Sequence, residues 1–150
     1  MHQVAEVSLR YKTEVAYDER PKISTPVEAE TYLRTIFDEE VLELHEVFII
    51  VMLNAARRVL GWSQISQGTK NATLVDTASV AQVVLLGNAT SVVLAHNHPS
   101  GKLQESASDL NLTVRLMKGL KLFQISVDDH IILTKDSYLS FREEGLMKES

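Results

Sequence analysis

The chain has 150 residues, of which 45% are hydrophobic and 23% charged, a size and composition typical of one compact domain. Its 15 Lys and Arg against 20 Asp and Glu give a formal net charge of -5, which argues against a protein that binds nucleic acid through bulk positive charge. The chain has no cysteine, which excludes disulfides, thiol nucleophiles and every zinc site built with Cys. Any metal must therefore be held by His and carboxylate side chains.

The N-terminal segment has no apolar core preceded by positive charge, so it lacks the pattern of a secretory signal. The most apolar runs, Val47–Leu53 and residues 92–95, are far shorter than the roughly 20 residues that span a bilayer. We therefore expect a cytoplasmic protein without a membrane partner.

The first predicted elements are a strand and a helix. Residues 4–11 alternate between apolar and polar side chains, with Ala5, Val7, Leu9 and Tyr11 on one face. This period of two predicts an edge strand or an ordered arm, which could pair with a second copy of the chain in a homodimer. Thr25, Pro26 and Glu28 supply a capping threonine, a proline at the first helical position and a Glu three residues after the cap. They predict a helix over 26–37.

The middle of the chain predicts a hairpin and a second helix. Residues 47–53 are continuously apolar and rich in β-branched side chains, as in a strand that is buried on both faces. A polar turn over 54–58 and a returning antiparallel strand over 59–67 follow. The apolar segment 77–86 predicts one covering helix.

The second half repeats the alternation of strand and helix. Residues 91–98 predict another buried strand, which Pro99 and Gly101 terminate. A helix from Ser106 to about residue 123 and a strand over 125–134 follow, and residues 138–146 indicate a short strand or a terminal helical turn. Strands and helices with short connections predict an α/β (α+β) fold around one central sheet.

Two histidines at the end of a predicted strand are the strongest chemical signal. Because side chains alternate across a strand, His96 and His98 lie on one face, side by side. Asp109, in the first turn of the next helix, can offer a carboxylate to the same point if the loop after His98 folds back. Two His and one Asp form a catalytic type of zinc site, because three protein ligands leave the fourth tetrahedral position open for water.

The spacing His-x-His-Pro-x6-Ser-x2-Asp, from His96 to Asp109, matches the JAMM metalloprotease motif of the JAB1/MPN domain family at every fixed position. The sequence His-Asn-His-Pro-Ser-Gly, with Glu46-Val-Phe upstream and Asp129-His-Ile-Ile downstream, resembles the bacterial RadC-like branch (DNA repair protein RadC family), over roughly residues 42–141. The resemblance implies a single three-layer α/β/α domain with a central mixed sheet and a cytidine-deaminase-like architecture. It divides the chain into residues 1–38, a strand and a helix in place of the family's longer helical region, and a metal-binding domain over 39–150.

The resemblance also implies a role for each site residue. His96, His98 and Asp109 correspond to the ligands of one Zn²⁺ per chain, Ser106 to the active-site serine and Glu46 to the general acid/base. The position of Glu46, the acidic residue at the lip of an otherwise apolar buried strand, agrees with this role. The implied function is a zinc-dependent hydrolase that cleaves a peptide or isopeptide bond with a zinc-activated water, so the expected partner is a peptide or protein substrate.

Several site residues have a structural alternative. Ser106 and Asp109 also fit a helix capping box, and Glu40 and Glu43 are rivals to Glu46. His130 could be a further ligand, a partner of a ligand or a structural residue, and we leave it outside the ligand set. Asn97, Ser100 and Gly101 are expected to shape the loop.

Two other functions remain open. One is a DNA-repair or nucleic-acid-associated accessory module with a structural zinc, against which the acidic balance argues. The other is a catalytically silent scaffold without metal, as some members of the family are. A salt-dependent DNA affinity would favour the first, and the absence of zinc would favour the second.

Overall fold

The structure is a computed structural model, which describes residues 4–8, 10, 12–68 and 74–149. In chain order its elements are η1 (Tyr17–Glu19), α1 (Pro26–Ile36), β1 (Val47–Leu53), β2 (Val59–Gln67), α2 (Thr77–Leu86), β3 (Ser91–Asn97), α3 (Ala107–Lys121), β4 (Ser126–Leu133) and β5 (Tyr138–Ser140). The predicted strand 59–67 and helix 77–86 have the bounds of β2 and α2. The helix predicted over 26–37 ends one residue earlier than expected.

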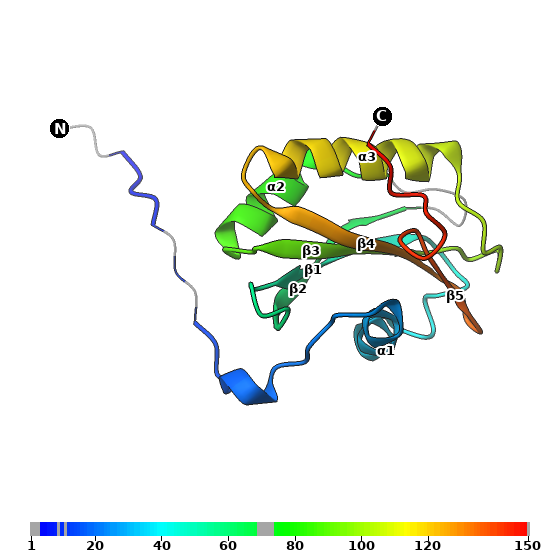
Figure 1. Cartoon of the computed structure of the whole chain (residues 1–150), viewed down its shortest axis with the longest axis horizontal. Helices are drawn as coiled ribbons and strands as arrows, with labels where there is room; N and C mark the ends of the chain where they lie inside the picture. Colours follow the sequence, from blue (N-terminus) through cyan, green and yellow to red (C-terminus); the bar gives the residue numbers. More distant parts are fainter. Residues whose placement is uncertain (1–3, 9, 11, 69–73, 150) are drawn as a thin grey trace.

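Within the described residues, five strands form one mixed sheet in the order β2-β1-β3-β4-β5. β1 runs antiparallel to β2 and β3, β3 runs parallel to β4, and β4 runs antiparallel to β5. A parallel pair needs a crossover, and α3 supplies it between β3 and β4. Figure 1 shows α1 on one face of the sheet and α2 with α3 on the other, so the expected three-layer α/β/α arrangement is confirmed.

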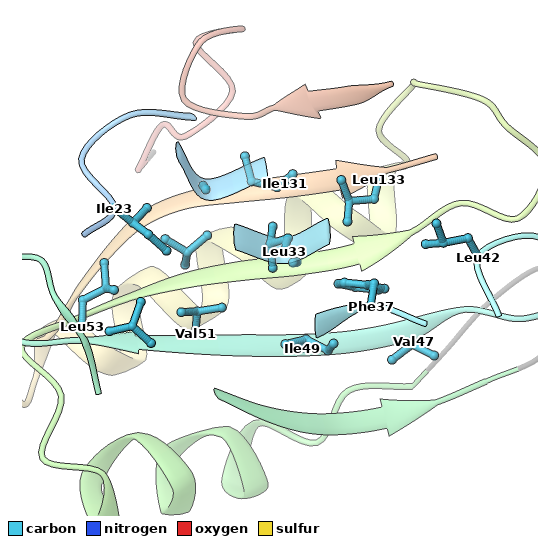
Figure 2. Packing of buried hydrophobic residues seen from close by; sticks show 14 residues of the cluster. Ile23, Leu33, Phe37, Leu42, Val47, Ile49, Val51, Leu53, Ile131 and Leu133 are labelled. Carbon is cyan, nitrogen blue, oxygen red and sulfur yellow. The ribbon is translucent and has the colours of Figure 1, made fainter. Parts of the chain in front are cut away.

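Two apolar clusters hold the layers together, one on each face of the sheet. On the α1 face, Ala29 and Leu33 pack against strand residues that include Ile49 and Val51. Figure 2 shows side chains of this cluster lying together over the central strands. On the other face, Val80 of α2 and other helix residues pack against the alternate residues of β1 and β3. Because β1 and β3 bury both faces, they form the continuous apolar runs seen in the sequence.

The predicted N-terminal strand is wrong for the residues that the structure describes, while the alternative of an ordered arm stays a prediction. The described residues 4–8 and 10 form no strand, and Val4 and Val7 are 90% and 87% exposed. Leu9 and Tyr11 lie outside the described residues. Figure 1 shows the described part of the chain before η1 leading away from the sheet. Pairing of this segment with a second copy of the chain stays a prediction.

The first predicted helix forms as its start signature indicates. Thr25 Oγ1 accepts a hydrogen bond from Glu28 N at 3.2 Å, and Glu28 Oε2 accepts one from Thr25 N at 3.0 Å, which completes a capping box. The division of the chain at residue 38 stays a prediction. Residues on both sides of this boundary share one core, because α1 packs against the sheet that the later residues form. No helix in the described part of the chain is long and apolar enough to cross a membrane.

Candidate metal centre

Two neighbouring strands bring predicted site residues to one end of the sheet. His96 of β3 pairs with Phe48 of β1, and Glu46 comes two residues before Phe48. Because side chains alternate along a strand, Glu46 and His96 both face the layer that contains α3. Only 7% of Glu46 and 2% of His96 is exposed. Buried ionisable side chains of this kind usually have a function or a charged partner.

Two histidines and two carboxylates meet at this point. The Nε2 atoms of His96 and His98 lie 2.9 Å apart. Asp109 is the nearer carboxylate, with Oδ1 3.3 Å from His96 Nε2 and Oδ2 3.4 Å from His98 Nε2. Glu46 Oε1 lies 3.8 Å and 4.0 Å from the same two nitrogens. Glu46, His96 and His98 form a group that could hold a metal ion, because their ligand atoms lie within 4.8 Å of one another.

The loop after β3 fixes the orientation of His98. The backbone N–H of His98 donates to Leu133 O at 2.9 Å, and its ring Nδ1–H donates to Lys102 O at 2.9 Å. Gly101 has a φ of +80°, which L side chains rarely adopt, so its expected role in the loop is confirmed. Because Nδ1 carries the proton, neutral His98 directs the lone pair of Nε2 into the site.

The start of α3 supplies Asp109. Ser106 is the N-cap: its Oγ accepts from Asp109 N at 3.0 Å, and its backbone N–H donates to Asp109 Oδ2 at 2.9 Å. The capping box that the sequence left as an alternative is therefore present. The same carboxylate also faces the two histidines, so the structural and chemical roles of Asp109 coexist.

The site pushes the pKa values of its two carboxyl groups in opposite directions. Burial alone would raise the pKa of Asp109, but the electrostatic attraction of the nearby His96 and His98 rings outweighs burial and holds this pKa far below its usual range. Burial raises the pKa of Glu46, and the charges of His96 and His98 only partly offset this. Asp109 therefore stays ionised, while Glu46 accepts a proton more readily.

The pKa of His98 is raised above its usual 6.5. Burial of the ring would lower it, but hydrogen bonds with Asp109 and the Lys102 carbonyl outweigh burial. A proton therefore competes for Nε2 of His98 at a higher pH than it would for a free imidazole.

A cavity of about 460 Å³ opens over these side chains, within the range of small-ligand pockets. Ser106 lines it and is exposed to it at the start of α3. The other lining residues are four apolar ones, Phe48, Val75, Pro99 and Leu112, and five polar ones, Ser100, Lys102, Gln104, Glu105 and Ser108. The rival carboxylates Glu40 and Glu43 are exposed and lie outside this lining.

We expected Asn97 to shape the loop, but its side chain instead ties β3 to β1 and to the segment before it. Its side chain is fully buried; Oδ1 accepts from Val47 N at 2.8 Å, and Nδ2 donates to Leu42 O and His45 O at 2.9 Å each. These bonds hold the backbone on both sides of Glu46. In the sequence, this role of Asn97 was indicated only by the position of a polar residue at the end of an apolar strand. Ser100 does act within the loop, where its Oγ accepts from Lys102 N at 3.3 Å.

His130 is a partner of a candidate ligand, one of the three roles that the sequence left open. It lies on β4, is fully buried, and places Nε2 2.7 Å from His96 Nδ1. Burial and the neighbouring His96 hold the pKa of His130 well below 6.5. In the sequence, the role of His130 was indicated only by the presence of a histidine within an apolar strand.

Comparison with known proteins places this site in a family. The family model described as "RadC-like JAB domain" matches residues 23–146, which include the whole stretch that carries the motif resemblance. A UPF0758 protein of Thiobacillus denitrificans is 41% identical over 124 residues, and one of Pseudomonas fluorescens is 38% identical over 123 residues. Each alignment covers 82% of this chain and 54% of the relative. A UPF0758 protein of Aquifex aeolicus is 33% identical over 144 residues, or 96% of this chain and 59% of the relative. The chain thus spans little more than half the length of these relatives.

Proposed function

The chain belongs to the family of RadC-like JAB domains, and on this premise we propose that it is a zinc-dependent hydrolase that cleaves a peptide or isopeptide bond. One observation carries the proposal: His96, His98 and Asp109 meet at one point, with the buried carboxylate of Glu46 beside them. A carboxyl group with a raised pKa next to one with a lowered pKa suits acid–base chemistry.

The donor set fits zinc. Zinc takes His nitrogen and carboxylate oxygen at about 2.0–2.2 Å in tetrahedral geometry, so two ligands of one ion lie roughly 3.2–3.6 Å apart. Asp109 Oδ1 lies 3.3 Å from His96 Nε2, and Asp109 Oδ2 lies 3.4 Å from His98 Nε2. The two histidine nitrogens, 2.9 Å apart, are within about 0.5 Å of that spacing. Glu46 Oε1, at 3.8 Å and 4.0 Å from the same nitrogens, is the more distant carboxylate, and the family resemblance gives it the acid–base role instead. We therefore assign His96, His98 and Asp109 as the ligands.

Glu46 is the proposed general acid/base. When bound, zinc supplies Lewis acidity, which lowers the pKa of a coordinated water toward about 7 and polarises a carbonyl. The Glu46 carboxylate accepts a proton from the attacking water and returns it to the departing amine. Its raised pKa suits both steps, because the group can then hold and release a proton nearer neutral pH.

Ser106 is the proposed donor to the carbonyl oxygen of the substrate. Its Oγ already accepts from Asp109 N, which fixes the side chain at the helix start and leaves the hydroxyl proton able to donate into the cavity. A donor held in this way stabilises negative charge as it develops on the oxygen.

The variant Glu46→Gln tests the proposal against a matched control, Glu43→Gln, whose side chain is 64% exposed. Each protein is loaded with zinc and incubated with a complex peptide mixture, and new termini are identified by mass spectrometry. We expect cleavage by the wild type and by Glu43→Gln, and a loss of at least about 10²-fold in Glu46→Gln with zinc retained. Isopeptide-linked conjugates replace the peptides if none is cut.

Retention of activity in Glu46→Gln would remove Glu46 from the role. A zinc-loaded wild type that cleaves neither substrate class would overturn the hydrolase proposal and favour an accessory module with a structural zinc.

A further inference from the structure

A buried chain of hydrogen bonds runs from the start of α3 to His96 through Thr113 and His130. Thr113 Oγ1 lies 2.7 Å from the backbone carbonyl oxygen of Asp109 and 2.6 Å from His130 Nδ1. His130 Nε2 lies 2.7 Å from His96 Nδ1. Thr113 is 1% exposed and His130 fully buried, so water does not compete for these bonds.

The backbone carbonyl of Asp109 fixes which atom donates in each of these hydrogen bonds. A carbonyl oxygen can only accept, so the one hydroxyl proton of Thr113 is donated to Asp109 O. Thr113 Oγ1 must then accept the proton of His130 Nδ1. Neutral His130 carries one ring proton, so its Nε2 is an acceptor.

The same logic fixes the proton of His96. Because His130 Nε2 accepts, His96 donates from Nδ1, and its Nε2 carries a lone pair. That Nε2 is the atom that faces His98 Nε2 and Asp109 Oδ1. The hydrogen-bond chain therefore selects the tautomer of His96 that can bind a metal from the site side.

Aromatic packing fixes the position of His130, the residue in the middle of this row of hydrogen bonds. The His130 ring contacts two aromatic rings, with centroid distances of 4.5 Å to Phe141 and 5.8 Å to Phe48. The ends of the chain are attached to two candidate ligands: one reaches the ring of His96, and the other the backbone of Asp109. Thr113 and His130 thus link the ligand from β3 to the ligand from α3.

We infer that His130 and Thr113 are positioning residues for the metal centre, which hold His96 in its Nδ1-protonated tautomer and orient its Nε2 toward the ion. The inference rests on the proposed zinc site, but it concerns residues outside the ligand set. Groups that hydrogen-bond to a metal-ligating histidine raise metal affinity by roughly 10–100-fold in known sites.

The first test reads the tautomer directly, without metal. Two-bond ¹⁵N–¹H correlation spectra of the metal-free full chain distinguish a protonated Nδ1 from a protonated Nε2 in each histidine. We expect His96 in the Nδ1-protonated form in the wild type, and a mixed or Nε2-protonated form in His130→Phe, which keeps an aromatic ring but has no acceptor. Nε2-protonated His96 in the wild type would overturn the inference, whether or not the protein binds zinc.

The second test compares zinc dissociation constants, measured by competition with a chromophoric chelator. We expect roughly 10–100-fold weaker binding in His130→Phe and in Thr113→Val, with affinity restored in His130→Gln, which keeps an acceptor for His96, and in Thr113→Ser. The matched control is Thr31→Val: Thr31 Oγ1 also donates to a helical carbonyl four residues back, Val27 O at 2.8 Å, but on the exposed face of α1. It should bind zinc as the wild type does.

The outcomes separate the two proposals. Equal zinc affinity in the wild type, His130→Phe and Thr113→Val would contradict the positioning role while leaving the zinc site intact. A wild type that binds no zinc would sink the proposed function, and the spectra of the metal-free protein would still decide the tautomer. If His130→Phe does not fold, the Thr113→Val and Thr113→Ser pair carries the comparison.

Discussion

His96 and His98 direct their Nε2 atoms at each other across 2.9 Å. The other ring nitrogen of each is a donor, to His130 Nε2 for His96 and to Lys102 O for His98. Two neutral rings held in this way present two lone pairs to the same point, which repel each other unless a cation lies between them. The carboxylate of Asp109 adds negative charge at the same place, so the local structure is arranged to hold a cation.

The affinity for zinc should fall as the pH is lowered through the raised pKa of His98. The hydrogen bonds with Asp109 and Lys102 O outweigh burial and hold that pKa above 6.5, so a proton competes with the metal at a higher pH than for a free imidazole. We expect the dissociation constant to rise about tenfold per pH unit below that pKa. Asp109, with its lowered pKa, stays ionised throughout and adds no step. Competition titrations over a pH series measure this, and a constant that does not vary with pH would contradict it.

Removal of the metal should leave the protein folded but less stable. The cluster between α1 and the sheet lies on the face opposite the site and does not depend on it. Zinc at about 100 times its dissociation constant stabilises the folded state by about 2.7 kcal/mol, which raises the Tm by roughly 5–10 °C. Thermal unfolding followed by circular dichroism, with chelator and with added zinc, checks this. An identical Tm in both samples would speak against specific binding.

Ser106 should show separable effects on stability and turnover. Ser106→Ala loses the N-cap of α3 and should lower the free energy of unfolding by about 0.5–2 kcal/mol, whereas Ser106→Gly should lower it by only a few tenths. Both variants lose the hydroxyl donor, so turnover should fall about 10²–10³-fold in each. Denaturant unfolding and peptide cleavage measure the two effects. Full turnover in Ser106→Gly would reduce Ser106 to a capping residue.

Asn97 should be among the most sensitive positions for stability near the site. Asn97→Ala leaves Val47 N and the carbonyls of Leu42 and His45 without their buried partner, and we expect a loss of about 3 kcal/mol in the free energy of unfolding. The matched control, Asn111→Ala on the exposed side of α3, should stay within about 0.5 kcal/mol. Urea unfolding of both variants gives the comparison, and similar values for the two would show that the buried network contributes little.

The sheet and helices could be predicted where local pattern and burial agree. β1 and β3 are continuous apolar runs because the sheet has helices on both faces, and the capping residues of α1 mark its start. The N-terminal strand could not be judged in this way. Alternation at Ala5 and Val7 indicates a strand only if a partner edge exists, and the sequence does not reveal that the described residues before η1 lead away from the sheet.

The candidate site was predictable as far as its residues form one linear motif. His96, His98 and Asp109 lie within one strand, loop and helix, so their meeting follows from side-chain alternation and one turn of the chain. His130 and Thr113 reach His96 and Asp109 through contacts between β4, β3 and α3, and sequence spacing does not encode the register that aligns them. The role of Asn97 was missed for the same reason, since its partners lie some 50 residues earlier.

The metal content of untagged protein, measured by elemental mass spectrometry, shows whether His96, His98 and Asp109 bind a zinc ion. Three proteins are compared after equal exposure to zinc: the wild type, Asp109→Ala and the control Asp136→Ala, which alters an exposed carboxylate outside the cavity. We expect about one zinc per chain in the wild type and in Asp136→Ala, and its loss in Asp109→Ala. A wild type without zinc, even when zinc is supplied, would contradict the proposed metal centre.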